Sequence, residues 1–222
     1  MKTLIAIPSM DQVPALFAQS LSMLQKVGDC VVAFQVGSLV YTARNHLAMR
    51  AIGLGSDYVL WLDSDMVFPA DVLEHFINTM EEKNIDILSG LYFRRVPPYT
   101  PTVFSKIYHD EYGVHCKEFD EIPTEIFEVE ALGFGCVCMK TSVLVDVFSK
   151  HYDLFTPMEG VGEDIAFCVR AKECGYKIYV DPTFDLGHVG HQMITREFAE
   201  QYRSVKNQQF YEEYKAIENG NA

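Results

Sequence analysis

The stretch Tyr58-Val59-Leu60-Trp61-Leu62-Asp63-Ser64-Asp65 joins an apolar run to two carboxylates. A short continuous apolar run predicts a strand buried on both faces, as in a parallel sheet covered by helices. Because alternate residues of an extended chain share a face, Asp63 and Asp65 are expected to point to the same side and bind one divalent cation. A metal at this rim of an α/β sheet would hold an anion, with a diphosphate favoured. The alternative is a solvated strand end or a helix cap before Pro69.

The first half of the chain alternates short apolar runs with helical patterns. This βαβ alternation predicts a largely parallel sheet, with the acidic pair at the end of a central strand. Asp11 is expected near a helix cap, and Pro69 is expected to open a helix. The predicted strands are 4–7, 31–34, 58–62 and 85–88, and the predicted helices are 11–27, 42–52 and 69–83.

The second half of the chain has α+β character. Four prolines punctuate the aromatic segment 93–124, which predicts hairpins or a mobile flap. Arg94 and Arg95 adjoin this segment and are candidates for contact with phosphate or an acidic acceptor. The predicted strands are 127–131, 136–139 and 177–180, and the predicted helices are 141–150 and 165–174.

Length and composition indicate one globular domain. The chain has 222 residues, 49% of them apolar, and a formal net charge of -13, which argues against a surface built to bind nucleic acid. The apolar run at the start is too short for a secretory signal, and no later run could span a membrane. A cytoplasmic location is therefore expected.

The apolar residues of the tail recur at near-helical spacing between Thr195 and Ile217. We expect a helical extension over 193–222 that packs on the domain or on a second copy, which would make a homo-oligomer. The preceding residues 1–192 are expected to form the main domain, which the family resemblance given next would make a catalytic domain with a nucleotide-binding half at 1–92 and an acceptor and metal half at 93–192.

Six short motifs follow one another along residues 1 to about 192. They are Ile7-Pro8-Ser9, Thr42-Ala43-Arg44-Asn45, Asp63-Ser64-Asp65, Gly133-Phe134-Gly135, Gly162-Glu163-Asp164 and Gly187-His188. In this order they resemble a glycosyltransferase of the GT-A fold, of the compact, family 2-like type found in bacteria and phages.

The resemblance implies an α/β, Rossmann-like GT-A fold with a mixed, mostly parallel sheet flanked by helices. It also implies a metal-dependent hexosyltransferase with a DxD motif. Such an enzyme moves a sugar from a nucleoside diphosphate donor, expected to be a UDP-sugar, to an acceptor. The acceptor is not identified: a glycan, lipid, protein or modified base would fit, whereas nucleic acid is disfavoured by the charge.

The same resemblance implies roles for the metal-binding residues. Asp65 would bind the cation directly, and Asp63 would contact the donor ribose or the metal through water. His188 would be the third metal contact, with His191 as a competitor for this role. An imidazole beside carboxylates favours Mn²⁺ over Mg²⁺.

The donor-binding residues follow by the same analogy. Pro8 and Ser9 would hold the nucleobase and ribose, and Ser64 would line the donor site between the two acids. Arg44 would bind the diphosphate, although a surface arginine is the alternative. Gly133 and Gly135 would line the donor sugar, where missing side chains let the ring approach the backbone.

Glu163 and Asp164 precede a predicted helix. In inverting relatives the second acid of such a pair deprotonates the acceptor hydroxyl, so Asp164 is the candidate base and Glu163 an acceptor-binding partner. Acids are also favoured at helix N-termini for structural reasons alone. The sequence leaves open whether the enzyme inverts or retains.

Two other function classes remain alternatives. A nucleotidyltransferase would also bind a metal through paired acids, but the chain lacks a glycine-rich, basic loop after its first strand. A non-catalytic sugar-nucleotide-binding protein could keep the same fold.

Overall fold

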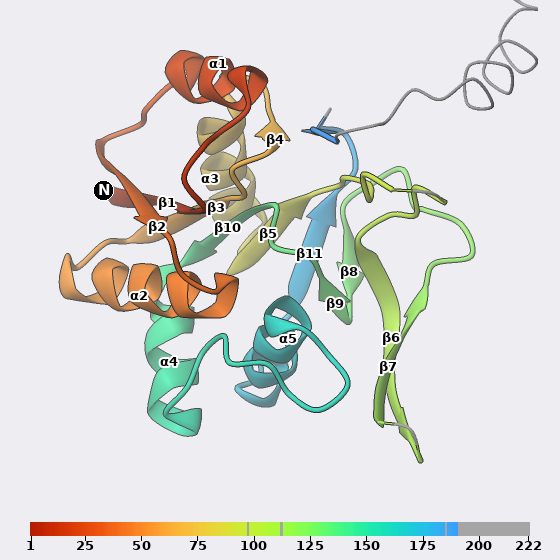
Figure 1. Ribbon diagram of the computed structural model, residues 1–222. Helices are drawn as coiled ribbons and strands as arrows, with labels where there is room; N and C mark the ends of the chain where they lie inside the picture. Colours follow the sequence, from red (N-terminus) through yellow and green to blue (C-terminus); the bar gives the residue numbers. More distant parts are fainter. Residues whose placement is uncertain (97, 112, 185, 191–222) are drawn as a thin grey trace, which may run out of the picture. The chain divides into compact units, whose positions relative to one another are not determined.

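The computed structural model describes residues 1–96, 98–111, 113–184 and 186–190 (Figure 1). Residues Met1–Val189 form one compact unit. The expected helix over 193–222 and the alternative metal ligand His191 lie outside the described residues. Among the described helices, none is both long and apolar enough to cross a membrane.

The core of this unit is a seven-stranded sheet with the order β2-β1-β3-β10-β5-β11-β8. Strands β2, β1, β3, β5 and β11 run in one direction, whereas β10 and β8 run against their neighbours. The expected mixed, mostly parallel sheet is confirmed. The strands are β1 (Lys2–Ser9), β2 (Asp29–Val36), β3 (Tyr58–Leu62), β5 (Ile87–Gly90), β8 (Phe127–Val129), β10 (Cys136–Lys140) and β11 (Ile178–Asp181).

Helices cover both faces of this sheet (Figure 1). Alternate residues of the central strands supply the two cores: Leu60 packs in the core with α1 and α3, whereas Val59 and Trp61 pack in the core with α2, α4 and α5. Burial on both faces explains why β3 is continuously apolar. The helices are α1 (Ala15–Met23), α2 (Val40–Gly53), α3 (Val72–Lys83), α4 (Thr141–His151) and α5 (Glu163–Glu173).

Two smaller sheets complete the unit. Strands β6 (Val103–Asp110) and β7 (Gly113–Glu118) form a hairpin, and β9 (Ala131–Leu132) pairs with β6. The hairpin expected in the proline-rich segment is thus present. Strand β12 (Gly187–His188) pairs with β4 (Met66–Val67), so that His188 lies opposite Met66. This second pairing brings the end of the described chain to the acidic turn.

Several predicted boundaries were wrong. Helix α1 begins at Ala15, and Pro14 occupies its N-cap position; Asp11 lies in the preceding loop and caps nothing. Pro69 does not open α3, because it belongs to a turn in which the Val72 N–H donates to the Pro69 carbonyl.

Two strand predictions also need correction. Strand β5 lies at Ile87–Gly90, two residues later than expected. The strand expected at 127–131 is two strands in different sheets, because the Glu130 N–H donates to the Phe104 carbonyl of β6.

Candidate functional site

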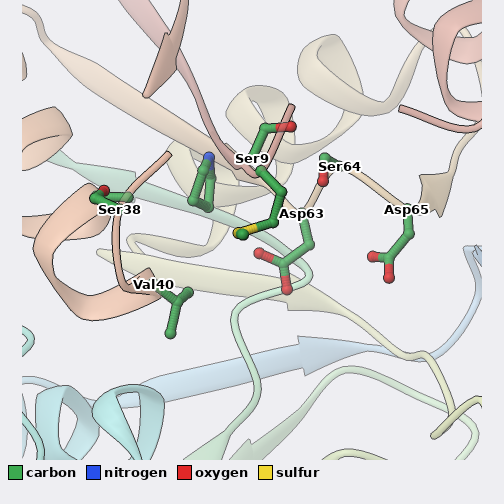
Figure 2. A pocket seen from close by; sticks show the side chains of 9 residues that line it. Ser9, Ser38, Val40, Asp63, Ser64 and Asp65 are labelled. Carbon is green, nitrogen blue, oxygen red and sulfur yellow. The ribbon is translucent and has the colours of Figure 1, made fainter. Parts of the chain in front are cut away.

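A pocket of about 200 Å³ opens where β1, β2 and β3 end (Figure 2). Such carboxyl ends are where open α/β sheets bind ligands. The pocket contains five residues predicted for the site: Pro8, Ser9, Asp63, Ser64 and Asp65. No sequence pattern indicated a site role for the rest of the lining, which is Met10, Ser38, Val40 and Ala43.

The missed residues come mainly from the start of α2 and the loop before it. Because β2 is parallel to β1 and adjacent to it, the loop that follows β2 reaches the same edge of the sheet as Ser9. The parallel order of the first strands was therefore the signal that could have placed Ser38 and Val40 in this pocket.

The two acids lie on a turn, and the expectation of extended backbone was wrong. The Asp63 N–H donates to the Gly135 carbonyl of the loop before β10 at 2.9 Å, and the Met66 N–H donates to the Asp63 carbonyl at 3.1 Å. Both carboxylates still project from the same side of the turn (Figure 2). They nevertheless bind different cationic side chains, so each carboxylate has its own environment.

Asp63 is bound by an arginine from inside the protein. Arg44 Nη2 donates to Asp63 Oδ1 at 2.8 Å, and Arg44 Nε lies 3.4 Å from Glu163 Oε1. The guanidinium carbon lies 5.4 Å from the centroid of the Phe134 ring. Burial disfavours the charge of Arg44, but Asp63 and Glu163 outweigh this effect and raise the pKa of the guanidinium.

Arg44 is therefore not a surface residue, whereas its expected contact with a diphosphate stays a prediction. Its side chain is only 2% exposed and does not line the pocket. The carboxylate of Glu163 is turned toward Arg44, and its expected role in binding an acceptor stays a prediction. In this structure Arg44 connects the turn after β3 to the start of α5.

Replacing Arg44 by methionine is expected to destabilise the fold by about 3–5 kcal/mol, because it leaves two partly buried carboxylates without their cation. Arg50→Met is a matched control, since Arg50 lies exposed on the same helix and its loss is expected to cost less than about 1 kcal/mol. Urea unfolding followed by Trp61 fluorescence measures both. Equal stability of the two variants would show that Arg44 does not hold these segments together.

Asp65 lines the pocket and contacts His188, which is not part of the lining. His188 Nε2 lies 3.5 Å from Asp65 Oδ2, and the Val189 N–H donates to the Asp65 carbonyl at 2.8 Å. Arg95 Nη1 pairs with the same carboxylate oxygen. Burial tends to raise the pKa of Asp65, but His188 and Arg95 outweigh it and lower the pKa. The hydrogen bond to Asp65 in turn raises the pKa of His188.

This pair has the chemistry of a divalent-cation site. His188 Nδ1 lies 2.9 Å from the Phe93 carbonyl oxygen, which orients the ring so that Nε2 faces Asp65, as second-shell contacts do for metal-binding histidines. Within the described residues, no three His, Cys, Asp or Glu side chains converge to hold a metal. The predicted set of Asp63, Asp65 and His188 is not assembled, because Arg44 binds Asp63. Two protein ligands suit a cation that is completed by substrate phosphates and water.

Gly133 and Gly135 do not line the pocket. Both are buried, and a Cβ atom would lie 2.4 Å from the Tyr92 hydroxyl at Gly133 and 2.6 Å from Tyr92 Cζ at Gly135. The Gly135 N–H donates to the Tyr92 hydroxyl at 2.9 Å. The space beside these two glycines, expected for the ring of the donor sugar, is therefore occupied by the ring of Tyr92. Tyr92 also lies edge-on to His188, with 5.6 Å between ring centroids.

Asp164 lies in the first turn of α5, where its Oδ1 accepts a hydrogen bond from the Ile165 N–H at 2.8 Å. Burial and the charge of Glu163 raise the pKa of Asp164 to about 6, although Ile165 and Arg44 oppose the rise. The hydrogen bond from the Ile165 N–H at the helix start lowers the pKa of Asp164, but burial outweighs it. A carboxylate with a pKa near 6 is ionised at neutral pH and still basic enough to take a proton in a reaction.

The layered sheet, the acidic turn after β3 and the return of β12 to that turn define a glycosyltransferase of the GT-A fold. Residues 19–147, more than half of the chain, match the model of glycosyl transferase family 2. The chain therefore belongs to that family and is a glycosyltransferase enzyme. This assignment favours glycosyl transfer over nucleotidyl transfer.

Two solved structures show how widely this fold is shared. A197 from STIV is 21% identical, with a TM-score of 0.60, over 86% of this chain and 87% of that chain. GalNAc-T7 with UDP, GalNAc and Mn²⁺ is 11% identical, with a TM-score of 0.61, over 86% of this chain and 44% of that chain. At these identities the likeness concerns the fold alone. No curated protein sequence matches the chain.

Proposed function

We propose that the enzyme transfers a sugar from a UDP-sugar to an acceptor hydroxyl and that it depends on a divalent cation, with Mn²⁺ preferred. The observation that carries this proposal is the contact of His188 with Asp65, one of the carboxylates that line the pocket. GalNAc-T7, which shares the fold, was solved with UDP and Mn²⁺, and this supports the choice of donor and metal.

Each part of the pocket has a proposed task. Pro8 and Ser9 contact the nucleoside, and Asp63 and Ser64 border the ribose and diphosphate. Asp65 and His188 hold the cation, which when bound neutralises charge on the departing diphosphate. Of the two halves of the domain, residues 1–92 are proposed to bind the nucleotide, and residues 93–192 are proposed to supply His188 and the residues that bind the acceptor.

Asp164 is proposed as the base that accepts the proton of the acceptor hydroxyl, which makes the enzyme inverting. Its carboxylate has a raised pKa, and its backbone follows Glu163, the partner of Arg44. Arg44 thus connects the donor side, through Asp63, to the helix that carries the base. With Glu163 bound to Arg44, the proposal assigns Glu163 a positioning role.

Isothermal titration calorimetry with UDP tests the donor and metal assignment. We expect UDP to bind at least about tenfold more tightly with Mn²⁺ than with EDTA, because the cation screens two phosphate charges that meet an acidic turn. UMP is the control: because it lacks the second phosphate, Mn²⁺ should increase its affinity much less than that of UDP. Equal UDP affinity with and without Mn²⁺ would refute the metal assignment.

A further inference from the structure

Residues 93–96 and 98–101 belong to a short loop that lies beside the acidic turn. It folds back on itself: Phe93 bridges to Pro101, and the Arg94 N–H donates to the Thr100 carbonyl at 2.9 Å. A further turn bond joins the Tyr99 N–H to the Val96 carbonyl at 2.9 Å. These contacts give the loop a defined shape that presents Arg95 to Asp65.

The 93–101 loop contacts both proposed metal ligands. Its first residue, Phe93, offers its carbonyl oxygen to His188 Nδ1, and Arg95 pairs with Asp65. The Arg95 side chain is half exposed, whereas Asp65 is 21% exposed. The arginine therefore approaches Asp65 from the solvent side, where a cation from solution would also arrive.

One carboxylate oxygen serves both cationic partners. Arg95 Nη1 and His188 Nε2 both pair with Asp65 Oδ2. A divalent cation bound to that oxygen and to Nε2 would bring two positive charges against the guanidinium at contact distance. Arg95 and the metal therefore cannot share this oxygen without strong repulsion.

We propose that Arg95 is a resident counter-ion of Asp65 that a divalent cation must displace. This inference rests on the proposed function, in which Asp65 is a metal ligand. In the metal-free enzyme Arg95 keeps the carboxylate neutralised, and the free fraction of Asp65 limits the apparent metal affinity. Arg95 thus sets the cation concentration at which the donor site becomes competent.

The test is calorimetric titration of Mn²⁺ into the full chain without nucleotide. Arg95→Gln should bind Mn²⁺ about three- to tenfold more tightly than wild type, because the competing ion pair is gone. Arg94→Gln is the matched control: it removes the same charge one residue away, and Arg94 is not among the described ion-pair partners of Asp65. Arg94→Gln should stay within about twofold of wild type.

Two different variants test the counter-ion role of Arg95 and the metal-ligand role of Asp65 separately. Mn²⁺ affinity of Arg95→Gln equal to or weaker than that of Arg94→Gln would overturn the counter-ion role. Unchanged Mn²⁺ affinity in Asp65→Asn would instead overturn Asp65 as a ligand, and with it the proposed metal site. Thermal unfolding of each variant establishes that the titrated protein is folded.

Discussion

Replacing Asp65 by asparagine should lower kcat/KM for the sugar donor by at least about 100-fold, because the cation loses its carboxylate ligand and no longer stabilises the leaving diphosphate. The Mn²⁺-dependent part of UDP binding should disappear in the same variant. The fold should survive, since Asp65 and His188 are only partly buried, the Arg95 partner is half exposed, and a pair with so exposed an arginine contributes about 1 kcal/mol or less. Donor turnover and UDP calorimetry measure the two effects.

Asp11→Asn is the control for the general loss of a negative charge. Asp11 is exposed and follows Met10, which lines the pocket, but no cation site involves it. Turnover by this variant should stay within about twofold of wild type, as expected for a surface substitution away from the chemistry. Metal-dependent UDP binding that survives in Asp65→Asn would refute the assignment of this ligand.

The second large effect is expected at Asp164. Asp164→Asn should lower kcat for transfer by about 10²–10⁴-fold, the usual contribution of a general base. Affinity for UDP and Mn²⁺ should be unchanged, because Asp164 does not line the donor pocket. Asparagine can still accept the hydrogen bond from the Ile165 N–H, so the start of α5 should be preserved.

The raised pKa of Asp164 also predicts two pH effects. At saturating donor and metal, kcat should rise as the pH increases through about 6, where the base becomes ionised. The folded protein binds this proton more tightly than the unfolded chain, so the ionised carboxylate opposes folding above about pH 6, and this penalty decreases as the pH falls toward 4. Asp164→Asn should therefore unfold at a higher temperature than wild type at pH 7.

Glu163→Gln is the matched control for the base. It changes the neighbouring carboxylate but leaves a side-chain oxygen for Arg44, so the rise of kcat with pH should remain, at a lower pH than in wild type because the charge of Glu163 contributes to the raised pKa of Asp164. Transfer by Asp164→Asn at the wild-type rate would show that the raised pKa of Asp164 has no catalytic use. A retaining mechanism would then be favoured.

The sequence predicted β3 to the residue, because a strand buried on both faces must be apolar at every position. It also placed the acidic pair at the right edge of the sheet. The predicted extended backbone of the acidic pair was wrong, since the Asp63 N–H donates to the carbonyl of Gly135, which lies in the loop before β10, far along the chain. Periodicity within one segment contains no information about such a partner.

Side-chain roles were harder to predict than positions. Arg44 and Glu163 are 119 residues apart, and nothing in either motif shows that they pair. Tyr92 was missed because its contact with the two glycines follows from packing after β5 and has no local pattern. His188 was placed beside Asp65 only through the resemblance to a family whose members fold a late histidine back to the acids.

The pairing of β12 with β4 has a consequence for how the enzyme matures. It joins Met66 to His188 across most of the described chain, and contacts of such long sequence separation form only after the intervening elements have lost their conformational freedom. In a nascent or partly folded polypeptide, the contact between Asp65 and His188 has therefore not yet formed. A chain emerging from the ribosome would therefore lack the proposed cation site until β12 has paired with β4.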